Sequence, residues 1–306
     1  MLSTKRAIIT GMIKPYAERT PDEQYKNLLR EILAKGTRVE SRQGTDALTL
    51  MGATPMHFKL ENGFPMITER SVKGFWQQAI GEICGFMNGA RTLEALESFG
   101  CKFWTPWGTK EKCEKRGLEE GDLGPGSYGG AFHDFPTSEG PTYNQFKNII
   151  EQIQEFPELR THFISPWVPQ YTIRGTGKQQ KVVVCPCHGW LHIRILNGKL
   201  TLHMFQRSGD VPVGVPSNMI QYGALTMMLA QATGYEAYEY IHTISDAHIY
   251  VDQIPMVEEL IARETKPFPT VTLNNPTKDI FAIRATDFEL SDYNAGESMR
   301  GIPVAV

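Results

Sequence analysis

Residues 184–218, VCPCHGWLHIRILNGKLTLHMFQRSGDVPVGVPSN, are the stretch that decides the fold. Apolar residues occupy alternate positions on both sides of Asn197-Gly198, at 191, 193 and 195 before it and at 200, 202 and 204 after it. Asn-Gly favours a two-residue hairpin turn, because both central residues of that turn need a positive φ. The pattern therefore predicts a β-hairpin, with a cysteine-rich segment at its entry and a polar segment at its exit.

Helices and strands flank this hairpin in mixed order. The spacing of apolar residues predicts helices over 22–33, 72–86, 146–153 and 218–233, and strands near 48–60, 238–243 and 270–273. Residues 103–130 are rich in Gly, Pro and charges, which predicts a long ordered loop. No stretch resembles a linker, so we expect an α+β fold and a single domain over 1–306, with an N-terminal extension at 1–20 and a surface loop excursion at 170–181.

The composition is that of a globular protein, with 41% hydrophobic and 21% charged residues in 306. A net charge of -3 gives no basic field, so we expect no DNA partner. The five cysteines are odd in number and show no paired framework, which predicts free thiols in a reducing compartment. The N-terminus lacks a signal-peptide pattern and no run of 18 apolar residues occurs, so we expect a soluble, cytoplasmic protein without a membrane partner.

Cys187 precedes His188 at the entry to the hairpin, and its pattern alone is open to several interpretations. A cysteine there can be a small buried hydrophobe or a nucleophile. A metal site would have to recruit His192 and His203, whose spacing matches no familiar zinc motif. A disulfide with Cys185 would meet the bridge geometry poorly, because near neighbours in a strand are badly oriented for it.

Glu82 lies inside the apolar helix predicted over 72–86. Burying a carboxylate is costly unless it is paired. Glu82 therefore either faces a wet edge or carries a function.

Several motifs together resemble one family. They are Gly63-Phe64-Pro65, the helix bearing Glu82, Gly121 to Pro125 with Tyr128, Cys187-His188, Gln206 to Asn218, Asp246 to Tyr250, and the tail Pro303 to Val306. In this order, from about residue 22 to 306, they resemble the thymidylate synthases and the related pyrimidine nucleotide hydroxymethylases. The resemblance implies a large mixed, mainly antiparallel sheet packed by helices, and a homodimer formed sheet to sheet.

The resemblance also implies the roles of individual residues. Cys187 would attack C6 of a 2'-deoxypyrimidine 5'-monophosphate, which makes C5 nucleophilic toward 5,10-methylenetetrahydrofolate, the co-substrate. The other expected catalytic residues are Glu82, Tyr128, Asn218, Asp210 and His188. The phosphate would be bound by Arg42, Arg160 from the second subunit, Arg207 and Ser208, and the rest of the nucleotide by Gln206, Asn218, His248 and Tyr250. The folate would be bound by Trp104, Trp107, Asp210, Gly214 and Val306, and no metal is expected.

Arg207 and Asn218 also have expected effects that follow from their chemistry. An arginine beside Cys187 would lower the thiol pKa as well as bind phosphate. The Asn218 amide both donates and accepts, so it can hydrogen-bond with O4 and N3–H of uracil. The family resemblance implies an aspartate at this position in relatives that act on cytosine. We therefore expect dUMP as the substrate.

The product is less determined by the sequence. Trp104 and the C-terminal tail favour exclusion of water and therefore reductive methylation to dTMP. Capture of the methylene intermediate by water would give hydroxymethylation of dUMP, dCMP or CMP instead. A relative that only binds nucleotide or RNA is a remote third reading.

The chain departs from the family pattern near the expected site. Thr161 stands where the family usually has a second consecutive arginine, and His162 is a candidate to compensate for it. Ser217 replaces a phenylalanine, and His242, with residues 244 and 245, replaces a tryptophan and a Gly-Gly pair.

Overall fold

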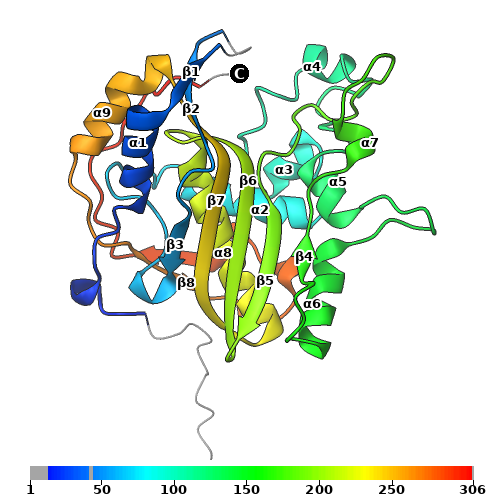
Figure 1. Ribbon diagram of the computed structural model, residues 1–306. Helices are drawn as coiled ribbons and strands as arrows, with labels where there is room; N and C mark the ends of the chain where they lie inside the picture. Colours follow the sequence, from blue (N-terminus) through cyan, green and yellow to red (C-terminus); the bar gives the residue numbers. More distant parts are fainter. Residues whose placement is uncertain (1–12, 41–43, 305–306) are drawn as a thin grey trace, which may run out of the picture.

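The computed structural model describes residues 13–40 and 44–304 (Figure 1). A seven-stranded sheet has the order β1-β2-β7-β6-β5-β4, and β3 also pairs with β7. The β6–β7 pair is parallel and the other pairs are antiparallel. Its strands are β1 Thr37–Val39, β2 Ala47–Met51, β3 Met56–Lys59, β4 Phe163–Ile164, β5 Trp190–Leu196, β6 Lys199–Asp210 and β7 Glu236–Tyr250. A second sheet pairs β8 Thr270–Leu273 with β9 Phe288–Ser291. The predicted mixed, mainly antiparallel sheet is confirmed.

The predicted hairpin is formed by β5 and β6, whose register closes on Leu196 and Lys199. Asn197 and Gly198 have φ values of 51° and 76°, the left-handed conformation that the tight turn requires. The alternating apolar side chains face the core, and Leu191, Ile193 and Leu202 are fully buried. This long hairpin brings the start of β5 and the end of β6 to the same end of the molecule.

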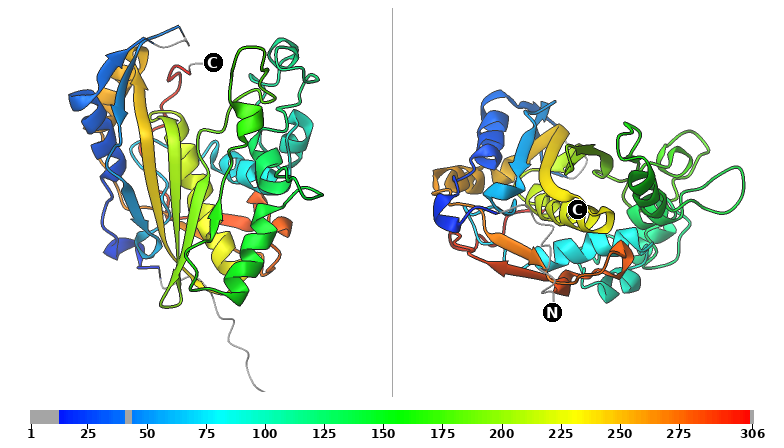
Figure 2. Two further views of the ribbon diagram at one scale, coloured as in Figure 1. Left: turned by 45° about the vertical axis from the view of Figure 1, so that its right-hand side comes forward. Right: turned by 90° about the horizontal axis from the view of Figure 1, so that it is seen from below.

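Two central helices cover one face of the sheet. α8, Gly214–Thr233, packs on β6 and β7, and α2, Trp76–Met87, packs on α8, so that sheet, α8 and α2 form successive layers (Figure 2). α8 is buried on nearly all sides and ends at Gly234, whose φ is 84°. Gly81 allows α2 a close approach to its neighbours, because a Cβ there would lie 2.2 Å from the Phe99 carbonyl oxygen.

Smaller helices surround these layers. They are α1 Gln24–Lys35, α3 Leu93–Ser98, α4 Lys110–Glu114, α5 Tyr128–His133, α6 Gln145–Glu155, α7 Pro169–Thr172 and α9 Ile254–Ala262. Segment 103–130, which was expected to be a loop, contains α4 and the start of α5. The surface excursion predicted at 170–181 begins within α7, and most of its later residues are exposed. Within the described ranges, no helix is long and apolar enough to span a bilayer. The opposite face of the large sheet carries no helix among the described residues (Figures 1 and 2).

Candidate active site

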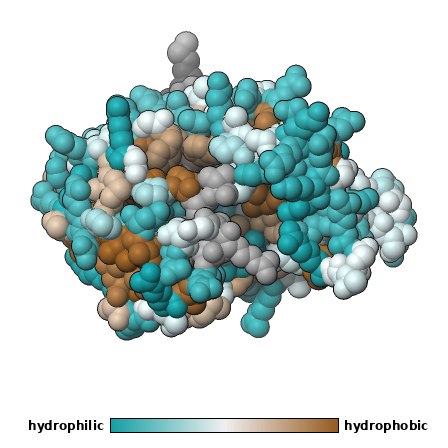
Figure 3. Space-filling model, turned by 90° about the horizontal axis from the view of Figure 1, so that it is seen from above, coloured by the Kyte–Doolittle hydropathy of each residue, from teal (hydrophilic) through white to brown (hydrophobic). Residues whose placement is uncertain are grey.

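A cavity of about 670 Å³ lies where β6 ends and α8 begins, between α2, residues 103–107 and the C-terminal residues 299–304. Viewed toward this end of the molecule, hydrophobic side chains gather around a hollow (Figure 3). The predicted site residues that line the cavity are Glu82, Trp104, Trp107, Tyr128, Cys187, His188, Gln206, Ser208, Asp210, Gly214 and Asn218. Residues from six separate segments of the sequence are thus brought to one place.

Cys187 lies at the start of the hairpin, and Arg207 holds its position beside the thiol. The Arg207 guanidinium donates to the carbonyl oxygens of Pro186, at 2.7 Å, and Cys185, at 3.0 Å, and its Nη2 lies 3.4 Å from Cys187 Sγ. Burial raises the pKa of the Cys187 thiol, and the Arg207 charge opposes that rise. The predicted lowering by Arg207 is therefore present, but burial outweighs it in the unliganded protein.

The other readings of the cysteine segment receive no support from this geometry. Cys185 and Cys187 are both free thiols. His192 lies on β5 and donates toward the Arg160 carbonyl oxygen, and His203 contacts Thr243 Oγ1, so neither histidine lines the cavity with Cys187. In the described part of the chain, no group of three or more His, Cys, Asp or Glu is placed to hold a metal ion.

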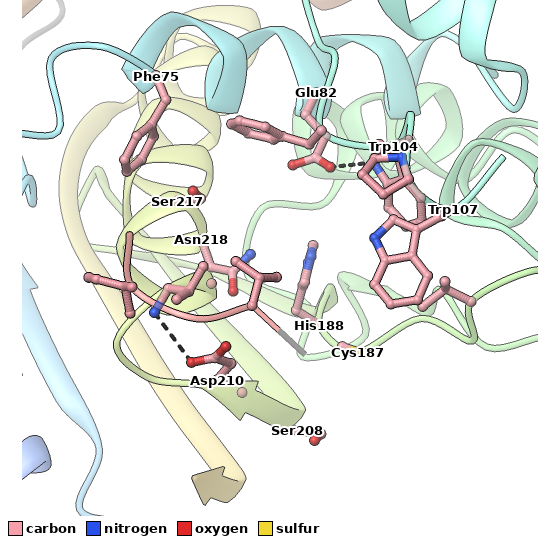
Figure 4. A pocket seen from close by; sticks show the side chains of 18 of the residues that line it. Phe75, Glu82, Trp104, Trp107, Cys187, His188, Ser208, Asp210, Ser217 and Asn218 are labelled. Atoms are coloured by element: carbon pink, nitrogen blue, oxygen red, sulfur yellow. Dashed lines mark hydrogen bonds between the residues drawn. The ribbon is translucent and has the colours of Figure 1, made fainter. Parts of the chain in front are cut away.

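Glu82 projects from α2 into the cavity, opposite Cys187 and near Asn218 (Figure 4). Its carboxylate accepts hydrogen bonds from Trp104 Nε1, at 2.5 Å, and from Gln221 Nε2. Burial raises the Glu82 pKa to about 7, while these two hydrogen bonds oppose the rise. A carboxyl group whose pKa lies near 7 is able to give and take a proton at neutral pH. Glu82 is also buried, so the expected wet edge is not where it lies.

Asn218 lies in the first turns of α8, and both ends of its amide are engaged. Its Nδ2 donates to Gln221 Oε1 at 2.9 Å, and its Oδ1 accepts from Gln206 Nε2 at 3.1 Å. Gln206 Oε1 lies 2.8 Å from His242 Nε2. Gln221 was not identified from the sequence, although its position three residues after Asn218 places the two side chains on the same helix face.

Tyr128 and His188 form the wall behind Cys187. Tyr128 Oη accepts the backbone N–H of Cys187 at 2.7 Å and that of His188 at 3.3 Å, and its ring stacks on His188. Burial and the Arg207 charge lower the His188 pKa to about 3, so the imidazole is neutral, and its Nδ1 contacts Tyr222 Oη. Burial holds the Tyr128 pKa well above its usual range.

Asp210 occupies the side of the cavity at the N-terminus of α8. Its carboxylate accepts the Val213 backbone N–H and both oxygens contact Gln253 Nε2 at 3.2 Å. Gln253 also donates to the Pro303 carbonyl oxygen, which ties the C-terminal segment to Asp210. Burial raises the Asp210 pKa to about 6. Gln253 was not identified from the sequence, since nothing local distinguishes it from a surface glutamine.

The residues expected at the sugar and phosphate lie around the mouth of the cavity or away from it. His248 and Tyr250 are on β7, beside the end of β6, in a register that pairs His248 with Asp210. Arg160 is exposed and does not line the cavity of this chain. His162 is fully buried and bonded to Gln152, so its expected role in replacing an arginine is wrong. Arg42, Val306 and residues 1–12 of the expected extension lie outside the described residues.

The cavity holds three groups that nucleophilic addition to a polar substrate requires. They are a thiol beside an arginine, a carboxyl group whose pKa is about 7, and an amide whose two ends are hydrogen-bonded. The comparison with protein families agrees: the model of the family described as thymidylate synthase matches residues 23–306, and the chain belongs to this family. It is therefore a one-carbon transferase, from a family that acts on deoxypyrimidine nucleotides with methylenetetrahydrofolate as co-substrate. The family predicted from the sequence motifs is confirmed.

Proposed function

We propose that this enzyme reductively methylates dUMP to dTMP, with Cys187 as the nucleophile that adds to C6. The observation that carries the methyl product is the C-terminal segment, which lines the cavity through Met299, Ile302 and Val304 and is tied to Asp210 by Gln253. Apolar side chains of this segment, once they cover the bound substrates, would exclude the water that would otherwise capture the intermediate. Hydride transfer from the folate is then the remaining outcome.

The cavity residues have separate tasks in this proposal. Arg207 stabilises the Cys187 thiolate as it forms and meets the substrate phosphate together with Ser208. As the Sγ–C6 bond forms, charge moves to O4, and Glu82 supplies a proton on that side of the base. After C5 has bonded the methylene carbon of the folate, the C5 proton leaves to solvent, assisted by the Tyr128 hydroxyl, which keeps its own proton, and the bond between that carbon and the folate nitrogen breaks. Hydride transfer from the tetrahydrofolate then reduces the methylene carbon to a methyl group. The Sγ–C6 bond breaks, which releases dTMP, dihydrofolate and the free Cys187 thiol.

We also propose that two copies pair through the uncovered sheet face. Phe163 and Phe205 are 53% and 38% exposed there, and Trp190 packs edge-on against Phe205. Exposed aromatic side chains on one sheet face favour a partner surface. Such pairing supports the predicted role of Arg160 at the partner's phosphate site.

Ser217 favours hydroxymethylation as a second candidate function. It lines the cavity beside Asn218, and its hydroxyl is able to hold a water molecule where a phenylalanine would exclude one.

Incubation with dUMP and methylenetetrahydrofolate, followed by mass analysis of both products, tests the proposal. We expect dTMP with dihydrofolate. A hydroxymethyl nucleotide with tetrahydrofolate would replace the proposal with the second candidate, and no product from dUMP would reject the proposal that dUMP is the substrate.

A further inference from the structure

A continuous chain of buried side-chain hydrogen bonds runs through the floor of the cavity. It starts at the indole of Trp104, passes through Glu82, Gln221, Asn218 and Gln206, and ends at His242. The side chains of Gln221 and His242 are fully buried, and Glu82, Asn218 and Gln206 are at most 7% exposed. The side-chain amides in this series of hydrogen bonds therefore bond to one another and not to bulk water.

The contacts at both ends of this hydrogen-bond chain agree on its direction. At one end, the Trp104 indole can only donate, and Glu82 in its ionised form can only accept, so that form requires Gln221 to turn its Nε2 toward Glu82 and its Oε1 toward Asn218. At the other end, Gln206 Nε2 also donates to the Ser208 carbonyl oxygen at 3.0 Å, so Nε2 must face Asn218 Oδ1. Both ends impose the same orientation on Asn218.

Reversing the Asn218 amide would place N–H against N–H at Gln206 and oxygen against oxygen at Gln221. Each opposed pair leaves buried polar groups without a partner, which is costly. An asparagine without these neighbours could rotate to suit either base, because a reversed amide offers the opposite pattern of donor and acceptor. The orientation of the amide thus determines which base edge fits.

We propose that Gln221 is a specificity-determining positioning residue that locks the Asn218 amide in the orientation that reads uracil and rejects cytosine. The inference rests on the proposed function, which places the C4–C5 side of the base toward Glu82. Nδ2, on the Gln221 and Glu82 side of Asn218, then donates its second hydrogen to O4. Oδ1, on the Gln206 side, accepts from N3–H. Cytosine has an amino group at position 4 and an unprotonated nitrogen at N3. Its amino group would face the Nδ2 donor of Asn218, and its N3 acceptor would face the Oδ1 acceptor.

Calorimetric binding of dUMP and of dCMP to the wild type and to Gln221→Met tests this proposal. Methionine matches the length of glutamine but can neither donate to Glu82 nor accept from Asn218. We expect the preference for dUMP over dCMP to fall about tenfold or more, as loss of a buried hydrogen bond predicts. Gln231→Met is the matched control: Gln231 lies on the same helix and bonds to the carbonyl oxygens of Asn275 and Thr277, and the preference should not change.

His242→Phe changes the other end of the series of hydrogen bonds, and it tests the same proposal if Gln221→Met does not fold. It removes the donor to Gln206 Oε1, and we expect a smaller shift in the same direction. Equal weakening of both nucleotides, or an unchanged preference in folded Gln221→Met, would overturn the proposal while leaving the proposed function intact. A wild type that binds neither nucleotide, or prefers dCMP, would overturn the proposed function and this inference together.

Discussion

The change Glu82→Gln should remove a pH dependence of stability that is caused by one buried carboxyl group. Glu82 is only 7% exposed, and burial raises its pKa from 4.5 to about 7. The folded protein therefore binds this proton more tightly than the unfolded chain does. The stabilisation is fully present below about pH 4.5 and is lost as the pH rises through about 7.

A rise in pKa of this size corresponds to about 3 kcal/mol of unfolding free energy. This is a large share of the roughly 5–15 kcal/mol that stabilises an ordinary domain. Burial also raises the pKa of Asp210, to about 6, so Asp210 likewise lowers the free energy of unfolding as the pH rises. Because Asp210 is present in both proteins, its contribution cancels when the wild type is compared with the Glu82→Gln variant.

Urea unfolding of both proteins between about pH 5 and 8 measures the effect. The unfolding free energy of the wild type should fall by about 2.5 kcal/mol relative to that of the variant across this range, because part of the effect lies below pH 5. A constant offset is also expected, because a second amide facing Gln221 disturbs the hydrogen bond between residues 82 and 221 at every pH. Glu97→Gln, at an exposed position on α3, is the control and should follow the wild type. Parallel curves for the wild type and Glu82→Gln would refute the reasoning.

Three further changes test other parts of the site. Cys187→Ser should abolish the covalent nucleotide adduct seen by mass spectrometry after acid quench and lower turnover by at least about a thousandfold, and retained turnover would exclude the covalent mechanism. Arg207→Met should slow iodoacetamide alkylation of Cys187 about tenfold or more, because the guanidinium lies 3.4 Å from Sγ; an unchanged rate would contradict its role at the thiol. Phe205→Asp should convert a dimer to monomers in sedimentation experiments by placing a charge on the uncovered sheet face, and an unaltered dimer would exclude that face.

Features of the fold that depend on neighbours in sequence could be predicted from the sequence. The β5–β6 hairpin follows from strict alternation and from the Asn197-Gly198 turn, and both are local signals. The end of α8 follows from Gly234, whose positive φ is local too. The strand order could not be predicted in this way, because the parallel pairing of β6 with β7 joins segments across the whole length of α8.

The same distinction applies to the site. Cys187, Asn218 and Asp210 stand in motifs and were predicted to share one cavity, which they do. Gln253 was missed because its contacts with Asp210 and with the carbonyl oxygen of residue 303 arise only from tertiary packing. Arg160 is a different case, since a residue expected to act in a second subunit has no place in the cavity of its own chain.

The departures from the family pattern become understandable once the hydrogen bonds around Asn218 are known. His242 appears from the sequence alone as an isolated replacement of an aromatic residue by a polar one. In the structure it donates to Gln206, which in turn donates to Asn218, while Gln221 engages the other end of the same amide. A buried histidine here needs an acceptor, and a buried glutamine at 221 needs both a donor and an acceptor. Gln221 meets both needs when the Asn218 amide keeps the observed orientation, and His242 supports that orientation through Gln206. On the proposal above, His242 therefore reinforces the preference for uracil and does not relax it.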